Sequence, residues 1–304
     1  MIVTGGVRMQ LTLNKIEKSF GVKNVLRGIS LSAESGKAFG LLGRNGAGKT
    51  TTIRILMNVF SADRGEILLD GKPIDYTKIK FGYLPEERGL YAKRKIAEQL
   101  IFFAELNGLS HKDAVASVEK WLVRFGMTEY ANKRLDTLSK GNQQKIQMIT
   151  ALAHNPQIVV LDEPFSGLDP VNAMLLKSVV KEEIAKGKIL FFSSHQMNYI
   201  EEFCDAIAIL NGGQVVLTGD IYDIKRNYPR NRLVIRSTET DAILAKYQDT
   251  AKLCEDGSVL LTLASPDQKA SVIQELSTLF DLDEVKVFEP TLNDIFVEYT
   301  ENEI

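Results

Sequence analysis

The chain has 304 residues, of which 44% are hydrophobic and 25% charged, which is the composition of an ordinary globular protein and enough length for two domains. Its formal net charge of −2 provides no broad basic field, so we expect no nucleic acid as the main partner. The two cysteines, Cys204 and Cys254, lie far apart without metal-ligand companions. We expect buried small hydrophobes in a reducing compartment rather than a disulfide or a zinc site.

The N-terminal residues 1–8 carry no motif and no signal-peptide pattern. No apolar run approaches the roughly 18 residues that span a bilayer. The sequence therefore predicts a cytoplasmic protein unless another subunit tethers it.

The first elements are three strands and a helix. Alternating apolar residues predict strands over 9–20 and 25–33, and a third strand over 37–43 runs into a glycine-rich stretch. Beyond the glycines, Ile53, Leu56 and Val59 follow near-helical spacing. The glycines should thus lie between a strand and a helix N-terminus.

Residues 43–50 fit the phosphate-loop pattern G-x-x-x-x-G-K-[ST] without a gap. The first amides of a helix lack partners within the helix and its dipole is positive there, so such a loop suits phosphate oxygens. Lys49 should neutralise the β and γ phosphates, and Thr50 should help to hold Mg²⁺. The residues expected to contact a nucleoside triphosphate here are Gly43, Arg44, Asn45, Gly46, Ala47, Gly48, Lys49, Thr50 and Thr51.

Two further strands should deliver catalytic side chains. The apolar run 158–161 ends in Asp162 and Glu163, and ligands bind at this edge of open α/β sheets. Asp162 can hold Mg²⁺ through water, and Glu163, followed by Pro164, is the candidate general base. A later apolar run ends just before His195.

The stretch LSKGNQQ, residues 138–144, resembles the LSGGQ signature of ABC ATPases, and its Ser139 stands 23 residues before Asp162, as in that family. Ser139 is also a good N-cap for the helix that follows, and Gly141 permits close approach. The resemblance covers about the first 225 residues. It implies that Phe20 stacks on adenine, that Asp169 belongs to the D-loop, and that His195 is the switch histidine near the γ-phosphate.

The sequence departs from the family at three positions. Glu86 stands where the family usually has a glutamine, and a carboxylate there can still ligate Mg²⁺ but adds negative charge beside a triphosphate. Lys140 and Asn142 replace the usual glycine and glutamine of the signature. Ser139, Gly141 and Asn142 remain the expected contacts to the phosphate held by a partner subunit.

Residues 90–135 have apolar side chains at helical spacing. The resemblance implies a helical subdomain, over about 90–155, whose groove beside the Glu86 loop receives a helix of a membrane subunit. Most of the apolar residues Leu100, Ile101, Phe102 and Phe103 should pack in the core, and one or two should face that partner.

The catalytic motifs stop after about residue 225, where a charged stretch ending near residue 232 predicts a linker. The remaining pattern, β-α-β-β-α-β with a hairpin at Asp256-Gly257, predicts a ferredoxin-like domain. The capped helix near the end resembles the tail of ATPase subunits of ABC-2-type exporters. This domain could bind a regulator, strengthen a dimer or cap the structure.

We therefore predict an α/β protein with an ABC ATPase domain over 9–225, composed of a RecA-like core, an antiparallel β subdomain and a helical subdomain, and a small α+β domain over 230–304. It would be the ATP-binding subunit of an exporter, using ATP and Mg²⁺ as a homodimer or heterodimer, bound peripherally to the inner face of the cell membrane through a separate permease. The alternative is a soluble ABC ATPase that acts on ribosomes or nucleic acid. A regulatory GTPase would need an N-K-x-D motif, which is missing from the sequence.

Overall fold

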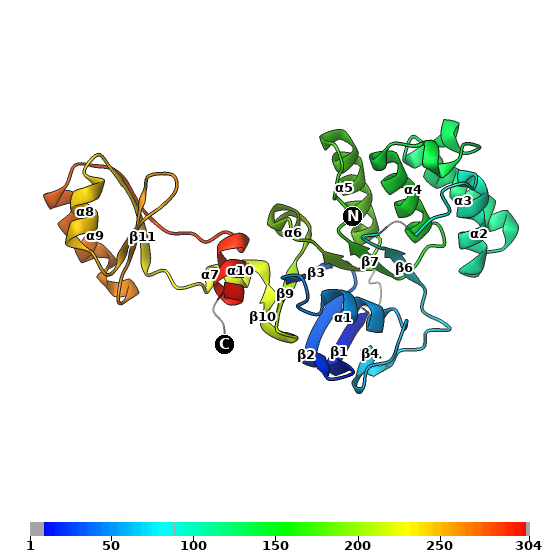
Figure 1. Ribbon diagram of the computed structural model, residues 1–304, viewed down its shortest axis with the longest axis horizontal. Helices are drawn as coiled ribbons and strands as arrows, with labels where there is room; N and C mark the ends of the chain where they lie inside the picture. The colour runs from blue at the N-terminus through cyan, green and yellow to red at the C-terminus, as the bar shows by residue number, and fades with distance from the viewer. Residues whose placement is uncertain (1–8, 88, 302–304) are drawn as a thin grey trace, which may run out of the picture. The chain divides into compact units, whose positions relative to one another are not determined.

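The computed structural model describes residues 9–87 and 89–301 (Figure 1). Contacts between Cα atoms divide them into two compact units, which are described separately below. The first unit holds the chain up to Ile221 and again from Phe296, and the second holds Tyr222–Ile295.

The first unit contains two sheets. The antiparallel sheet has the order β2-β1-β4-β5, and alternate side chains of β1, such as Leu11 and Leu13, are fully buried. Its strands are β1 (Gln10–Phe20), β2 (Lys23–Glu34), β4 (Arg64–Leu69) and β5 (Lys72–Pro73). The three predicted N-terminal strands are confirmed as β1, β2 and β3 (Ala38–Gly43). Strand β3 belongs to the second sheet.

The second sheet has six strands in the order β10-β9-β3-β8-β7-β6. All of its strand pairs are parallel except β9 with β10. Its other strands are β6 (Phe81–Leu84), β7 (Ile158–Asp162), β8 (Ile189–Ser193), β9 (Ala206–Asn211) and β10 (Gln214–Asp220). Strands β7 and β8 are buried along their whole length, which explains their unbroken apolar sequences.

One apolar core joins the two sheets. Alternate residues of β3 and β8, including Phe39 and Phe191, pack with β1, β2 and the helix α1 (Lys49–Leu56). This core fixes α1, and with it the end of β3, against both sheets. The helix is shorter than the sequence pattern predicts: it ends at Leu56, Asn58 has φ 55°, and Val59 is exposed rather than on a buried helix face.

The predicted helical region is confirmed as a group of three packed helices (Figure 1). They are α2 (Ile96–Leu106), α3 (His111–Arg124) and α4 (Lys140–Leu152). Two further helices, α5 (Pro170–Ala185) and α6 (Met197–Phe203), follow β7 and β8 along the chain. None of the helices within residues 9–87 and 89–301 combines the length and the apolar character needed to cross a bilayer.

The second unit has the predicted β-α-β-β-α-β order. Its sheet runs β12-β13-β11-β14 with every neighbouring pair antiparallel, which is the ferredoxin-like arrangement. Its elements are β11 (Arg232–Ser237), α8 (Thr240–Lys246), β12 (Ala251–Leu253), β13 (Val259–Thr262), α9 (Lys269–Leu279) and β14 (Leu282–Val287). Leu233, Ile235 and Leu276 belong to its own apolar core.

Two short helices stand at the ends of this unit in the sequence, α7 (Ile221–Arg226) and α10 (Leu292–Glu301). The predicted cap of the last helix is present: Asp294 N donates to Thr291 Oγ1 over 3.1 Å, and Thr291 N donates to the Asp294 carboxylate over 2.8 Å. The predicted burial of the cysteines holds for Cys204, whereas Cys254 is only half-buried.

Candidate nucleotide-binding site

Four neighbouring parallel strands end at the same edge of the large sheet. Strand β3 leads into the phosphate loop, β8 into His195, β7 into Glu163 and β6 into Glu86. Since β3, β8, β7 and β6 are consecutive in the sheet, the structure brings these predicted residues to one edge.

The glycines of the phosphate loop are required by its backbone. Gly46 and Gly48 have φ values of 82° and 112°, in a region that favours glycine. A Cβ atom on Gly48 would lie 2.6 Å from Leu26 Cδ2, and one on Gly43 would lie 2.6 Å from the carbonyl oxygen of Leu210. The loop is therefore closely packed against β2 and β9 while its amides precede the first turn of α1.

Lys49 is folded back over the loop that precedes it. Its Nζ donates to the Gly43 carbonyl over 2.6 Å and to the Arg44 carbonyl over 3.4 Å. Burial lowers the pKa of Lys49, while the nearby carboxylates of Glu163, Asp162 and Glu86 act in the opposite direction. The ammonium group and the three acidic side chains that the sequence singled out thus share one electrostatic environment.

Asp162 is held by the next strand. The hydroxyl of Ser193 on β8 donates to Asp162 Oδ1, at a position where β7 and β8 place the two residues side by side. Burial raises the pKa of Asp162 and the charge of Glu86 adds to this, whereas the hydrogen bond from Ser193 and the charge of Lys49 oppose it. A buried carboxylate of this kind is stabilised in its charged form by a cation.

Oxygen donors at this edge suit Mg²⁺. Mg²⁺ is bound by oxygen ligands, and such oxygens are provided here by the carboxylates of Asp162 and Glu86 and by the hydroxyl of Thr50. Across the described parts of the chain, no cluster of three or more His, Cys, Asp or Glu residues could hold a metal by itself. The donor set therefore fits an ion that keeps several water molecules and shares the phosphates of a nucleotide, as Mg²⁺ does.

Glu163 and His195 form a preorganised pair. Glu163 Oε1 accepts a hydrogen bond from the backbone N–H of His195 over 2.7 Å, and His195 Nδ1 lies 2.7 Å from the same oxygen. Ser194 Oγ donates to Glu163 Oε2 over 3.0 Å. Because a carboxylate oxygen accepts hydrogen bonds, the contact requires Nδ1 to carry a proton. The backbone of Glu163 has φ 50°, which is uncommon for a residue other than glycine.

The two sides of this pair differ in exposure. The Glu163 side chain is 9% exposed, whereas that of His195 is 71% exposed. The carboxylate is thus held in place from within the protein, and the imidazole presents its other nitrogen to solvent or to a ligand.

The signature segment packs against the predicted D-loop of the same chain. Ser139 caps α4 by accepting from Asn142 N over 3.4 Å, which confirms the predicted cap. A Cβ atom on Gly141 would lie 3.0 Å from Asn172 Nδ2 and 3.7 Å from Asp169 Oδ2. Asp169 in turn caps α5, and the hydrogen bond from the Asn172 backbone lowers the pKa of Asp169.

The signature does not reach its own phosphate loop by hydrogen bonds. Among the hydrogen bonds formed by the described residues, none joins residues 139–142 to residues 43–50.

Phe20 lies at the end of β1 and is half exposed. Its ring meets that of Phe60 edge to face at 5.5 Å, and Lys18 Nζ lies 5.6 Å from the centres of both rings. Its exposed half is aromatic surface of the kind that can stack on a base.

The sequence reasoning overlooked Ser193 and Ser194, which hold Asp162 and Glu163, as well as Phe60 beside Phe20. The signal for the serines was present, because Ser193 ends the strand that precedes His195, Ser194 follows it, and parallel neighbours align their carboxyl ends.

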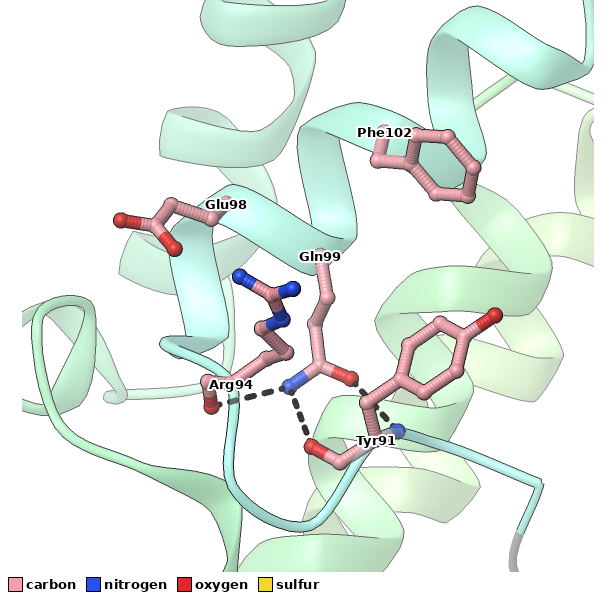
Figure 2. A pocket seen from close by; sticks show the side chains of 5 residues that line it. All are labelled: Tyr91, Arg94, Glu98, Gln99 and Phe102. Atoms are coloured by element: carbon pink, nitrogen blue, oxygen red, sulfur yellow. Dashed lines mark hydrogen bonds between the residues drawn. The ribbon is translucent and has the colours of Figure 1, made fainter.

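A separate hollow of about 460 Å³ opens at the start of α2 (Figure 2). Its lining residues are Tyr91, Arg94, Glu98, Gln99 and Phe102. The buried Gln99 amide holds the backbone around it, accepting from Tyr91 N over 3.2 Å and donating to Tyr91 O over 3.4 Å and to Arg94 O over 3.5 Å.

The four apolar residues of α2 differ in exposure, and of the core positions predicted for most of them only that of Leu100 is fully buried. Leu100 is fully buried and Ile101 and Phe103 are half-buried, whereas Phe102 is 50% exposed. Tyr91, stacked on Phe103 at 6.1 Å, is 57% exposed. The exposed rings of Tyr91 and Phe102 both line the hollow.

The fold and this site define a phosphate-loop nucleotide-binding protein. Comparison with known proteins narrows the class: the family described as ABC transporter matches residues 26–166, and the family described as ATP-binding protein DrrA1-3-like, C-terminal domain, matches residues 219–300. The chain belongs to the ATP-binding proteins of ABC transporters and is an ATPase. The predicted family and fold class are confirmed.

Individual relatives agree with this assignment. The chain is 41% identical over 291 residues to the ABC transporter ATP-binding protein YhaQ of Bacillus subtilis (strain 168), covering 95% of this chain and 97% of that protein. It is 32% identical over 213 residues to the Nod factor export ATP-binding protein I of Burkholderia lata, covering 69% and 70%. A solved ATP-binding subunit of an ABC transporter superposes with a TM-score of 0.66 at 30% identity, covering 72% of this chain and 92% of that one.

Proposed function

We propose that this chain is the ATP-binding subunit of an ABC exporter and drives a separate membrane permease by hydrolysing ATP. The observation that carries the ATPase part is the pair Glu163 and His195, fixed at the same sheet edge as Lys49 and Asp162. Export is supported by the name of a relative, the Nod factor export ATP-binding protein I. The cargo is determined by the permease and not by this subunit.

In the proposed reaction the phosphate loop binds the triphosphate. The backbone amides of residues 43–51 and the Lys49 ammonium contact its oxygens, and Phe20 stacks on adenine. Thr50, Asp162 and Glu86 would hold Mg²⁺, which neutralises phosphate charge when bound.

Glu163 acts as the general base. Its carboxylate is already oriented by Ser194 and His195, so it can take a proton from the attacking water without reorganising. His195, with Nδ1 bound to Glu163, would use its other nitrogen to contact the γ-phosphate.

Two copies would enclose each ATP. Ser139, Gly141, Asn142 and Asp169 of one copy would complete the site at the phosphate loop of the other. The proposal is supported by the match of the chain to the ABC transporter family and by the way Gly141 lies against Asp169. Size-exclusion chromatography of Glu163→Gln with Mg-ATP tests this arrangement. We expect a dimer, and the same variant carrying Lys49→Ala should stay monomeric. A monomer of Glu163→Gln at saturating Mg-ATP would exclude the two-copy site.

The permease would dock at the α2 hollow, where Tyr91 and Phe102 are exposed. This contact would place the subunit at the inner face of the membrane. The test is whether a polytopic membrane protein co-purifies with this chain from membrane extracts. Phe102→Ala should weaken the complex, whereas Val123→Ala, which removes an exposed apolar side chain of α3, should not. Co-purification with ribosomes and with no membrane protein would instead favour a soluble ABC ATPase.

A further inference from the structure

A second hollow, of about 400 Å³, lies wholly within the unit Tyr222–Ile295. It is formed where α7 and the residues after it meet the segment that follows β14. We call it the basic hollow. The lining residues that matter here are Tyr222, Arg226, Tyr228, Arg230, Phe288 and Glu289.

Positive charge dominates the basic hollow. Lys225, Arg226 and Arg230 line it, and Glu289 is the one acidic side chain among its lining residues that the structure describes. Within residues 9–87 and 89–301, neither Arg226 nor Arg230 forms an ion pair or a side-chain hydrogen bond. Two guanidinium groups that face one hollow without partners are suited to an anion.

Some other arginines of the described chain do have an acidic partner. Arg236 of the same unit lies 3.0 Å from Asp256 Oδ2 and 3.6 Å from Glu284 Oε2. Arg124 contacts Glu182 in the other unit. Arg226 and Arg230 have no such acidic partner among the described residues, and both line the same hollow.

Aromatic rings form the rest of the wall. The guanidinium of Arg232 lies 5.6 Å from the ring centre of Tyr228 and 5.9 Å from that of Phe288, and its Nη1 donates to Tyr228 Oη over 3.1 Å. This stack fixes the two rings. Tyr222, on the same segment as Tyr228, is 69% exposed and also lines the hollow.

We propose that the basic hollow binds a nucleoside monophosphate or a ligand of the same chemistry, with its phosphate between Arg226 and Arg230 and its base stacked on Tyr222. Guanidinium groups bind phosphate oxygens in a bidentate fashion, and every base has a face that stacks on an aromatic ring. The carboxylate of Glu289 can accept hydrogen bonds from ribose hydroxyls. A volume of about 400 Å³ lies in the range of small-molecule sites. This proposal does not depend on the exporter assignment.

Isothermal titration calorimetry on the full chain tests the proposal. The chain carries Lys49→Ala, so that the phosphate loop does not compete, and is titrated with AMP and separately with inorganic phosphate. We expect one AMP per chain. The double substitution Arg226→Ala/Arg230→Ala should weaken AMP binding by about 10-fold or more, the usual loss when hydrogen bonds to a charged group are removed. Tyr222→Ala should weaken AMP binding and leave phosphate binding unchanged.

The matched control is Lys252→Ala/Lys286→Ala, which removes the same charge from the same unit outside the basic hollow and should leave AMP binding unchanged. Arg226 and Arg230 are exposed, so their double variant should unfold at the same temperature as its parent. Absence of AMP binding, or AMP binding that survives the arginine substitutions, overturns the proposal. A second result would also overturn the proposal: the chain sediments with phosphatidylglycerol vesicles, the arginine substitutions abolish this, and AMP does not bind. The two arginines would then bind a lipid surface.

Discussion

Replacing Glu163 by glutamine should stop most ATP turnover while leaving the fold intact. A general base contributes about 10²- to 10⁴-fold, or about 3 to 5 kcal/mol of the activation barrier. A glutamine can keep the local hydrogen bonds: its amide oxygen accepts from His195 N, and its amide nitrogen donates to the Ser194 hydroxyl. We therefore expect a loss of less than about 1.5 kcal/mol in the free energy of unfolding.

Glu163→Ala separates these two effects. It removes every acceptor that Ser194 and His195 use at this position, and a buried donor without a partner costs about 1–3 kcal/mol. Alanine should thus lower both turnover and stability, whereas glutamine should lower turnover alone. The assay is steady-state phosphate release with Mg-ATP, together with urea unfolding of each variant. A Glu163→Gln protein that is folded and hydrolyses ATP within about threefold of the wild-type rate would refute the assignment of Glu163 as the base.

Three other expectations concern single positions. Gly82→Ala should lower the free energy of unfolding of the first unit by about 1–3 kcal/mol, because a Cβ atom there would overlap the carbonyl oxygen of Ala151 in α4. An unchanged midpoint of urea unfolding would contradict this packing. Burial raises the pKa of Cys204, so iodoacetamide should label Cys254 before Cys204, as followed by mass spectrometry. Equal labelling of the two cysteines in the folded protein would contradict the burial of Cys204. Hydrogen bonds from Ser258 lower the pKa of Asp256 to about 2, so its ionised form stabilises the fold above pH 4 and this contribution is lost as the pH falls toward 2. Asp256→Asn should therefore lower stability at pH 7 but not at pH 2, and a constant difference between the two proteins would exclude this linkage.

The structure shows what Glu86 does in place of the glutamine that is usual in the family: its charge acts on Asp162 and Lys49. The negative charge of Glu86 raises the pKa of Asp162, and it raises the pKa of Lys49 against the lowering caused by burial. Glu86 therefore acts on both charged groups of the site although its own side chain is exposed. A glutamine at this position would remove a negative charge from the edge where the triphosphate is proposed to bind.

The sequence by itself determined the local features of this protein. The glycine pattern of residues 43–50, the apolar strand before Asp162 and the cap at Ser139 each depend on neighbouring residues and a short stretch of backbone, and the structure has them where they were predicted. The order of elements after residue 231 likewise fixed the ferredoxin-like unit, because the alternation of apolar residues specifies each strand and helix. The helix after the phosphate loop was misjudged, since spacing alone extended it to Val59.

Only the tertiary structure decided which distant side chains meet. Ser193 holds Asp162 because β7 and β8 align in parallel with one register, and Gly141 lies against Asp169 because the first turn of α4 meets the residues at the start of α5. Phe102 is exposed and Phe103 half-buried although they are adjacent in the sequence, because the packing of α2 decides which face is covered. The basic hollow depends on two segments about 60 residues apart, so no local pattern could predict it. Side-chain pairing across long separations follows from sheet register and helix packing, and neither is encoded in the spacing of residues along one element.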